Sequence, residues 1–216
     1  NSSVKGGHWT GGLIGISGGW GGEGPVRMVL TIDGCSVVGS SISGAGSVGG
    51  IIGHAINDAN TVETINATVT GNTITSTGSS KIKAGAVMGT VGVSTTTVNV
   101  IENNNTVTSG GAAIDRIYGR FGSDGSTLSI TGGSYSATAS GFVDPDAKNN
   151  TLVISGGTFA SEPPAKFIAE GFQATANPDG TYSVGEAPAV AKIGDTEYKD
   201  LAKALQAAAA TKGDVT

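Results

Sequence analysis

Apolar and polar residues alternate along short stretches of the chain, and the same stretch recurs several times. Residues 29–38 place apolar side chains two apart, then a small polar or glycine corner, then a second apolar run. Residues 128–135 and 152–159 repeat this order position for position, and 35–43 and 67–75 carry looser versions. Because side chains alternate between the two faces of a strand, each copy predicts a strand, a tight bend and a second strand.

A second, glycine-rich motif recurs through the first half of the chain. It reads Gly-Gly-Leu-Ile-Gly at 11–15, Gly-Gly-Ile-Ile-Gly at 49–53 and Gly-Ala-Val-Met-Gly at 85–89. A degenerate copy occupies 116–119. Each interval between copies holds one strand unit, so we expect one long coil to contain both motifs.

Repetition of strand units predicts a stacked architecture. We expect an all-β fold, a right-handed parallel β-helix (β-solenoid), over residues 1–160. The composition suits it, because β-branched residues favour strands, Gly and Asn tolerate bends with positive φ, and Thr or Asn can form ladders between coils. The positions expected to point inward are Leu30, Ile32, Val37, Val69, Ile74, Val100, Leu128, Ile130, Leu152 and Ile154.

The pattern changes after residue 160. Residues 161–186 are expected to cap the stack, with a hairpin over 172–184 around the turn Asn-Pro-Asp-Gly, and with Phe167, Ile168 and Phe172 covering the open coil. Residues 187–216 predict the start of a following repeat, truncated here: a short hairpin or strand and then a short amphipathic helix. The expected signals of that helix are Tyr198, Leu201, Ala202 and Leu205 at helical spacing, Asp195 or Thr196 as N-cap, and Gly213 as a stop.

Composition narrows the function classes. Only 13% of the residues are charged and the formal net charge is -5, so the basic footprint of a nucleic-acid-binding protein is missing. No apolar run approaches the roughly 20 residues that cross a bilayer, so no membrane insertion is expected. Cys35 is the single cysteine, and its strand position predicts a buried, unreactive side chain.

Ionisable residues cluster around Tyr118: Asp115, Arg116, Arg120 and Asp124. On a strand, Asp115 faces away from Arg116, Tyr118 and Arg120, so the cluster predicts a basic-aromatic stripe instead of a carboxylate pair. Three interpretations stay open for it: an ordinary solvated face, a contact to carbohydrate or an anion, and catalysis. Arg116, Tyr118 and Arg120 are therefore candidate ligand-binding residues, and no catalytic residue is assigned.

Oxygen ligands gather in the loop that contains Asp144, Asp146 and Asn149, which predicts either a calcium site or a turn held by Pro145. The loop lacks the acidic spacing of an EF-hand, so the turn is the simpler interpretation, and no metal or other cofactor is assigned.

Aromatic residues gather near the N-terminus: His8, Trp9 and Trp20. An exposed indole can stack on a sugar ring, which makes Trp9 and Trp20 candidate ligand-binding residues. The alternative is that both tryptophans cap the N-terminal end of the coil or pack against sequence that lies outside the given chain. His54 follows Gly53 with no His or Cys at metal-ligand spacing, so it predicts no metal site.

The glycine-hydrophobic motifs at 11–15 and 49–53 resemble the GLUG repeats of large bacterial surface proteins that contain right-handed β-helical regions. The segment 157–184 resembles one that closes β-helical regions in secreted proteins of Gram-positive gut bacteria. This resemblance implies an extracellular, cell-surface or secreted, adhesin-like context and no catalytic residues.

The function expected from the sequence is thus a non-enzymatic segment that displays loops to host protein or glycan. The alternative is a polysaccharide-active β-helix enzyme, a lyase or glycoside hydrolase, with an incomplete site in this chain.

Overall fold

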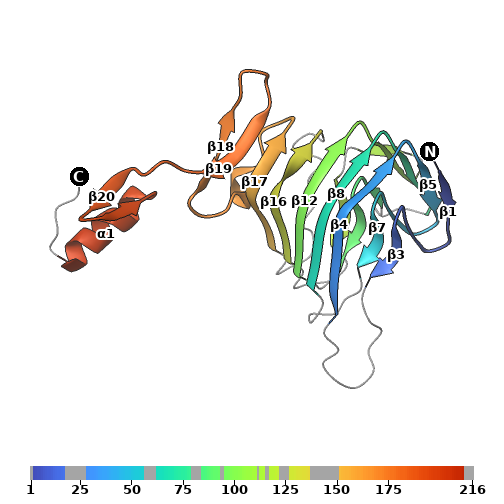
Figure 1. The fold of residues 1–216 in the computed structure, drawn as a ribbon, viewed down its shortest axis with the longest axis horizontal. Coiled ribbons are helices and arrows are strands. Elements are labelled where there is room, and N and C mark those ends of the chain that lie inside the picture. The colour runs from blue at the N-terminus through green and yellow to red at the C-terminus, as the bar shows by residue number, and fades with distance from the viewer. Residues whose placement is uncertain are drawn as a thin grey trace.

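Parallel strands that lie side by side form most of the molecule, and the chain advances along its long axis from the N-terminus towards a C-terminal hairpin and helix (Figure 1). The computed structural model describes residues 2–17, 28–55, 62–78, 84–92, 95–110, 112–114, 117–121, 127–136 and 151–211. Strands predominate in these residues, and one α-helix is present among them. The expectation of an all-β fold is therefore confirmed.

The largest sheet lies between the C-terminal helix and the N-terminal strands in the view of Figure 1. Its first five strands are parallel, and its last two are antiparallel. In spatial order the strands are β4 (Val29–Val38), β8 (Val62–Thr70), β12 (Thr95–Asn103), β16 (Thr127–Tyr135), β17 (Thr151–Phe159), β19 (Tyr182–Glu186) and β18 (Phe172–Ala176).

Three smaller sheets complete the stacked part. One contains β3 (Ile14–Ser17), β7 (Ile52–Ala55), β11 (Met88–Val91) and β15 (Tyr118–Phe121). A second contains β1 (Ser3–Lys5), β5 (Ser41–Gly44), β9 (Thr73–Ser76), β13 (Thr106–Ser109) and the antiparallel β14 (Ala112–Ile114). The third contains β2 (Trp9–Gly11), β6 (Ser47–Gly49) and β10 (Ala84–Gly85).

The chain visits these four sheets in a fixed order. The sets β1 to β4, β5 to β8 and β9 to β12 each place one strand in every sheet, and we call each set a circuit. Strands of successive circuits pair in parallel, with Val29, Val62, Thr95, Thr127 and Thr151 aligned across the largest sheet. Equivalent residues of successive circuits are therefore neighbours in space.

The core follows the alternation that the sequence predicts. Buried residues alternate with half-buried ones along β8 and with half-buried or exposed ones along β12, so every second side chain enters the interior. Nine of the ten expected inward residues are buried, and Leu30 is partly buried against the same core. Cys35 is also only partly buried. Both lie on β4, which is the edge strand of its sheet among the described strands.

The looser copies 35–43 and 67–75 form two strands around a bend, as predicted. In the copies 29–38, 128–135 and 152–159 the expected bend is a β-bulge, and here the prediction of two separate strands is wrong. β4, β16 and β17 each continue through their glycines, and the pairing register shifts there. Gly34, Gly133 and Gly157 supply positive φ angles of 62°, 95° and 109°. Glycine reaches these angles without a Cβ clash, so the strand absorbs one extra residue and stays paired.

The glycine motif marks a corner where two backbones touch. Its first glycine ends a strand of the β2–β6–β10 sheet, and its last glycine lies in or beside a strand of the β3–β7–β11–β15 sheet. A Cβ on Gly49 would lie 2.0 Å from the Ile52 carbonyl oxygen and 2.8 Å from the Gly89 nitrogen. Equivalent approaches join Gly11 to Gly53 and Gly85 to Gly119. The first glycine of each copy thus packs on the last glycine of the next.

An asparagine ladder holds the turn between the largest sheet and the β1–β5–β9–β13 strands. The Asn72 side chain accepts a bond from the Ser40 N–H at 2.8 Å and donates to the Val37 carbonyl at 2.9 Å and to Asn105 Oδ1 at 2.9 Å. Asn105 in turn donates to the Val69 carbonyl at 2.9 Å. Asn72 is 1% exposed, so these bonds satisfy polar atoms that water cannot reach.

The C-terminal end of the stack is covered as predicted. The short 3-10 helix η2 (Ala165–Phe167) buries Phe167, while Ile168 forms a bridge to Ile154 and, with Phe172, packs against the core. The predicted hairpin is present as β18 and β19, and β19 pairs with β17. Gly180 turns it with φ 84°.

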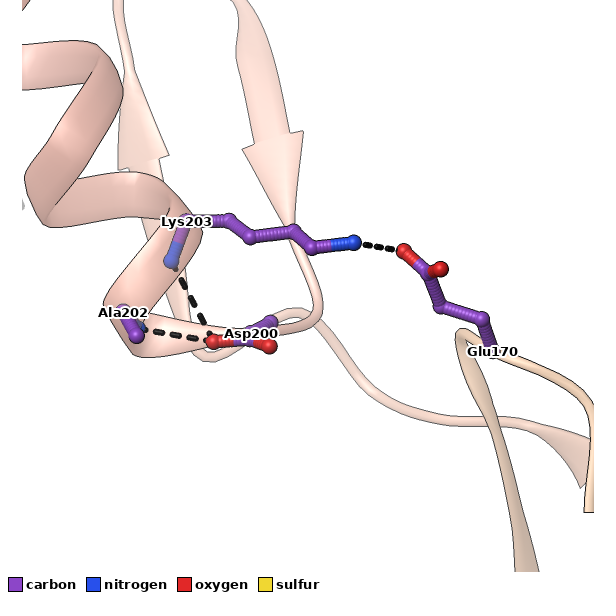
Figure 2. Close-up of polar contacts among 4 residues, drawn as sticks. All are labelled: Glu170, Asp200, Ala202 and Lys203. Carbon is purple, nitrogen blue, oxygen red and sulfur yellow. Dashed lines mark hydrogen bonds and ion pairs between the residues drawn. The ribbon is translucent and has the colours of Figure 1, made fainter.

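A small C-terminal unit follows: β20 (Ala191–Ile193) and β21 (Thr196–Tyr198), which form a hairpin, and α1 (Leu201–Thr211). The predicted N-cap was wrong, because Thr196 and Tyr198 belong to β21. Asp200 is the cap, and its Oδ1 accepts bonds from the N–H groups of Ala202 at 2.8 Å and Lys203 at 3.2 Å (Figure 2). The ammonium of Lys203 pairs with Glu170 of the preceding segment (Figure 2). Gly213, the predicted stop, lies outside the described residues.

We predict that Gly49→Ala lowers the free energy of unfolding by about 3 kcal/mol, the upper range for overpacking. The new methyl group would meet backbone atoms of two strands, which cannot rotate away. Gly7→Ala is the matched control, because no atom lies within 4 Å of its added Cβ. Urea denaturation followed by circular dichroism measures both, and equal midpoints for the two variants would contradict the close approach.

Candidate functional site

Three aromatic rings meet on the first circuits and form what we call the Trp9 cluster: His8, Trp9 and His54. The Trp9 ring centroid lies 5.5 Å from that of His54 and 6.4 Å from that of His8. Trp9 is 42% exposed, which is high for so large a side chain on a strand. The cluster therefore presents an indole surface to solvent, fixed from one side by a second ring.

The glycine corner positions this cluster. Trp9 stands two residues before Gly11 on β2, and His54 follows Gly53 on β7. A Cβ on Gly53 would lie 2.5 Å from the Thr10 nitrogen, so β2 and β7 run in direct backbone contact. The contact between His54 and Trp9 was not predicted from the sequence. An alignment of the first glycine of one motif with the last glycine of the next would have predicted that His54 lies near Trp9.

An exposed, immobilised indole suits a limited range of chemistry. Its face packs against the C–H face of a sugar ring or against an apolar side chain, and its N–H can donate one hydrogen bond. Within the described residues, no group of three or more His, Cys, Asp or Glu side chains could hold a metal ion. The Trp9 cluster thus offers ring stacking, apolar contact and one N–H donor.

Of the other candidate ligand-binding residues, the structure describes Tyr118 and the backbone of Arg120. Trp20 and Arg116 lie outside the described residues. Arg120 lies on β15, where it aligns with Thr90, and Thr90 aligns with His54. The backbone of Arg120 is therefore two strands away from His54 in the same row.

Tyr118 contradicts the expected surface stripe. Its side chain is fully buried, in the row that contains Ile52 and Met88, so it cannot contact a surface ligand. Burial raises the pKa of Tyr118 well above its usual value, and the nearby Tyr135 contributes further. Tyr135 is also buried, and burial raises its pKa as well. Tyr118 points to the side of β15 that faces the core, whereas the prediction of a surface stripe assigned its side chain to solvent.

Two carboxylates, those of Glu63 and Glu102, are buried although the sequence did not lead us to predict it. Glu63 is 0% exposed; it accepts bonds from the Ser17 hydroxyl and, at 2.8 Å, from the Thr96 hydroxyl. Glu102 is 3% exposed and accepts from Asn105 Nδ2 at 2.8 Å and from the Ser136 N–H at 2.9 Å. Their signal was available, because both occupy inward positions of the alternating pattern.

These carboxylates do not form the pair that a glycoside hydrolase needs. Thr96, which aligns with Glu63, stands six residues before Glu102 on β12. At about 3.3 Å per residue this separates the two acids by roughly 20 Å along the strand. A pair that acts on a glycosidic bond is about 5 to 10 Å apart. The carboxylates of Glu63 and Glu102 thus accept hydrogen bonds from buried hydroxyl, amide and backbone donors.

The remaining acidic candidates fall outside the described residues. This applies to Asp115 and Asp124 beside Tyr118, and to Asp144, Asp146 and Asn149 in the proposed calcium loop. Both interpretations of that loop therefore stay predictions. Among the helices in the described part of the chain, none is long and apolar enough to cross a membrane.

A hollow that the sequence did not predict lies beside η2 and β18. Its volume is about 350 Å³, and its lining includes Pro163, Ile168 and Phe172 with Glu162 and Glu170. Apolar side chains and two carboxylates in one hollow suit an apolar group next to a cation. Lys203 already pairs with Glu170, so the C-terminal unit supplies one such cation.

We predict that stability falls in alkaline solution because of the buried tyrosines. A raised pKa in the folded state means that the unfolded chain ionises first, so stability is fully present below about pH 10 and is lost as the pH rises beyond it. Tyr118→Phe should reduce the loss between pH 8 and pH 11 by about 1.4 kcal/mol. Urea midpoints measured across this range test it, and identical losses in the variant and the original chain would refute it.

Comparison with known proteins provides no family for this chain. No family model matches it, and no curated protein or solved structure matches it. The resemblance to bacterial surface repeats accordingly rests on the sequence motifs, and function is argued from the fold and the exposed residues.

Proposed function

We propose that the four-sheet stack is a right-handed parallel β-helix that serves as a rigid display scaffold. The repeated circuits support this, because each contributes one strand to every sheet and pairs in parallel with the next. Connections between parallel strands of one sheet are right-handed in nearly all proteins. The asparagine ladder and the row of glycine corners are further features of a stack whose circuits repeat.

The scaffold would be a non-enzymatic segment of a bacterial cell-surface or secreted adhesin-like protein that presents its surface to host protein or glycan. One observation carries this proposal: Trp9 is the large aromatic side chain with the greatest exposure among the described residues, and its ring contacts that of His54 on the next circuit. A stack of parallel circuits is stiff, because each circuit contacts its neighbours along four sheets. Stiffness keeps a surface residue at a fixed distance from the rest of the protein.

The motifs at 11–15 and 49–53 support the same context through their resemblance to GLUG repeats. The C-terminal unit, β20 to α1, would then open a following repeat after the cap at 161–186. Its separate hairpin and helix, joined to the cap by an extended segment, support this division (Figure 1).

We predict that Trp9→Ala weakens retention on a neutral polysaccharide that binds the chain by about three- to tenfold, the loss expected for one stacking contact. The measurement is affinity electrophoresis against a panel of neutral and acidic polysaccharides. Ile101→Ala is the matched control, because Ile101 is 52% exposed on β12, away from the Trp9 cluster.

The same panel separates a scaffold from an enzyme. New reducing ends or unsaturated products from any polysaccharide would overturn the non-enzymatic proposal and support the polysaccharide-active alternative. Retention without product supports a glycan adhesin, whereas retention that Trp9→Ala leaves unchanged would exclude the Trp9 cluster as the site. Absence of retention on every member would leave host protein as the partner, to be tested by surface plasmon resonance.

A further inference from the structure

The C-terminal unit, β20 to α1, has a small interior of its own. Ala191 on β20 and Ala204 on α1 are buried, yet neither belongs to the apolar cluster that fills the stack. Among the described residues, no backbone hydrogen bond connects residues 151–187 with residues 190–211. The unit is joined to the cap by an extended segment (Figure 1). The core of the stack and the interior of this unit are therefore separate.

Two ion pairs connect the C-terminal unit to the cap at 161–186. The ammonium of Lys199 donates to a carboxylate oxygen of Glu186 at 2.5 Å. The ammonium of Lys203 pairs with Glu170 (Figure 2). The hydrogen bond and the charge of Lys199 also hold the pKa of Glu186 below its ordinary value, so this carboxylate stays ionised near neutral pH. We call these four residues the latch, since both carboxylates lie on the cap and both ammonium groups on the C-terminal unit.

The position of Lys203 is unfavourable within its own helix. It lies in the first turn of α1, where the backbone N–H groups and the helix dipole favour a carboxylate over an ammonium. Glu170 offsets this from outside the helix, because its carboxylate pairs with the ammonium. A residue that conflicts with its local structure but has a partner on another segment is typical of a functional position.

The latch is exposed to solvent. The carboxylate side chains of Glu170 and Glu186 are 80% and 74% exposed, and the side chains of Lys203 and Lys199 are 53% and 33% exposed. Exposed ion pairs of this kind are screened by salt, and each changes an equilibrium by a factor of only up to about five. The latch is therefore a weak and salt-sensitive connection.

A hollow of about 440 Å³ lies where the C-terminal unit meets the cap. Residues of both parts line it, including Phe172 from the cap and Tyr198 from the unit. The two surfaces are thus not closely packed there. The connection between the cap and the stack is different, because β19 pairs with β17 and Phe167 is buried in the core. Segments with few buried apolar contacts open at the lowest cost.

We propose that the latch is a salt-operated hinge. At low ionic strength the two ion pairs hold the C-terminal unit in one orientation on the cap, and screening by salt releases the unit to move about residues 187–190. The hinge follows from contacts within residues 151–211 and does not depend on ligand binding by the Trp9 cluster. Its consequence for display rests on the proposed function: if the unit opens a following repeat, the hinge sets the angle between two rigid stacks.

Single-molecule fluorescence energy transfer between the stack and the C-terminal unit tests the hinge. In a Cys35→Ser background, one dye is attached at Asn103→Cys on β12 and the other at Gln206→Cys on α1, both at exposed positions. At about 0.01 M sodium chloride we expect one narrow docked population. At about 1 M sodium chloride, where screening acts over roughly 3 Å, an open population with a broader distribution should appear.

Variants of the latch assign the effect to its ion pairs. Glu170→Gln with Glu186→Gln should open at low salt and raise the ratio of open to docked molecules by about tenfold, because both pairs are lost. Glu162→Gln is the matched control, since Glu162 lies on the cap and forms no ion pair among the described residues. Glu170→Lys alone should open the hinge, and combining it with Lys203→Glu should restore the docked population by exchanging the two charges.

Several outcomes would overturn the hinge. One is an identical distribution at both salt concentrations, and another is a double glutamine variant that stays docked at low salt. A third is a Glu162→Gln control that opens as far as that variant. Circular dichroism at both salt concentrations checks that α1 persists, and loss of its helical signal on opening would show unfolding instead of a hinge. Every variant retains Trp9, so glycan retention measured on the same proteins separates failure of the hinge from failure of the proposed function.

Discussion

The contact between backbones at the glycine corners is the constraint on which the rest of the structure depends. At each corner two sheets meet so closely that a Cβ on Gly49 would lie 2.0 Å from a carbonyl oxygen of its own circuit and 2.8 Å from a nitrogen of the next. Only glycine permits that approach. Because the approach recurs between successive copies, it fixes how each circuit sits on the next, and the in-register rows of the other sheets follow from it.

Once the rows are in register, the interior accepts polar groups that a compact apolar core would reject. Asn72 and Asn105 bond to one another and to turn backbone, and Glu102 joins the ladder through Asn105. Glu63 bonds to hydroxyls of two other strands. A buried polar group is costly only when it is left unsatisfied, and a stack supplies partners from the circuits on either side. The same regularity that permits these groups also keeps Glu63 and Glu102 too far apart for a shared catalytic role.

The described residues at the two ends of the stack differ in how far their apolar side chains are exposed. The C-terminal end is closed by η2 and the β18–β19 hairpin, while the first circuit leaves Leu13 and Val29 exposed. The Trp9 cluster lies on that same circuit, held by a ring from the next one. Trp9, Leu13 and Val29, three of the large exposed hydrophobic side chains among the described residues, thus lie on the first circuit.

Much of this fold was predictable from local pattern. Alternation identified nine inward residues, the first being Ile32 and the last Ile154, and the turn at Asn177 predicted the β18–β19 hairpin. Both were predictable because the side of a strand on which a residue lies, and the type of a turn, depend on neighbouring residues. Contacts between segments about thirty residues apart were not predictable in this way. They made Tyr118 a core residue, brought His54 to Trp9 and turned the bends expected at Gly34, Gly133 and Gly157 into bulges. The sequence by itself determined which side chains point inward along each strand, and only the tertiary structure decided which rows they join, because the register between circuits is set by packing across the corners and not by any residue's immediate neighbours.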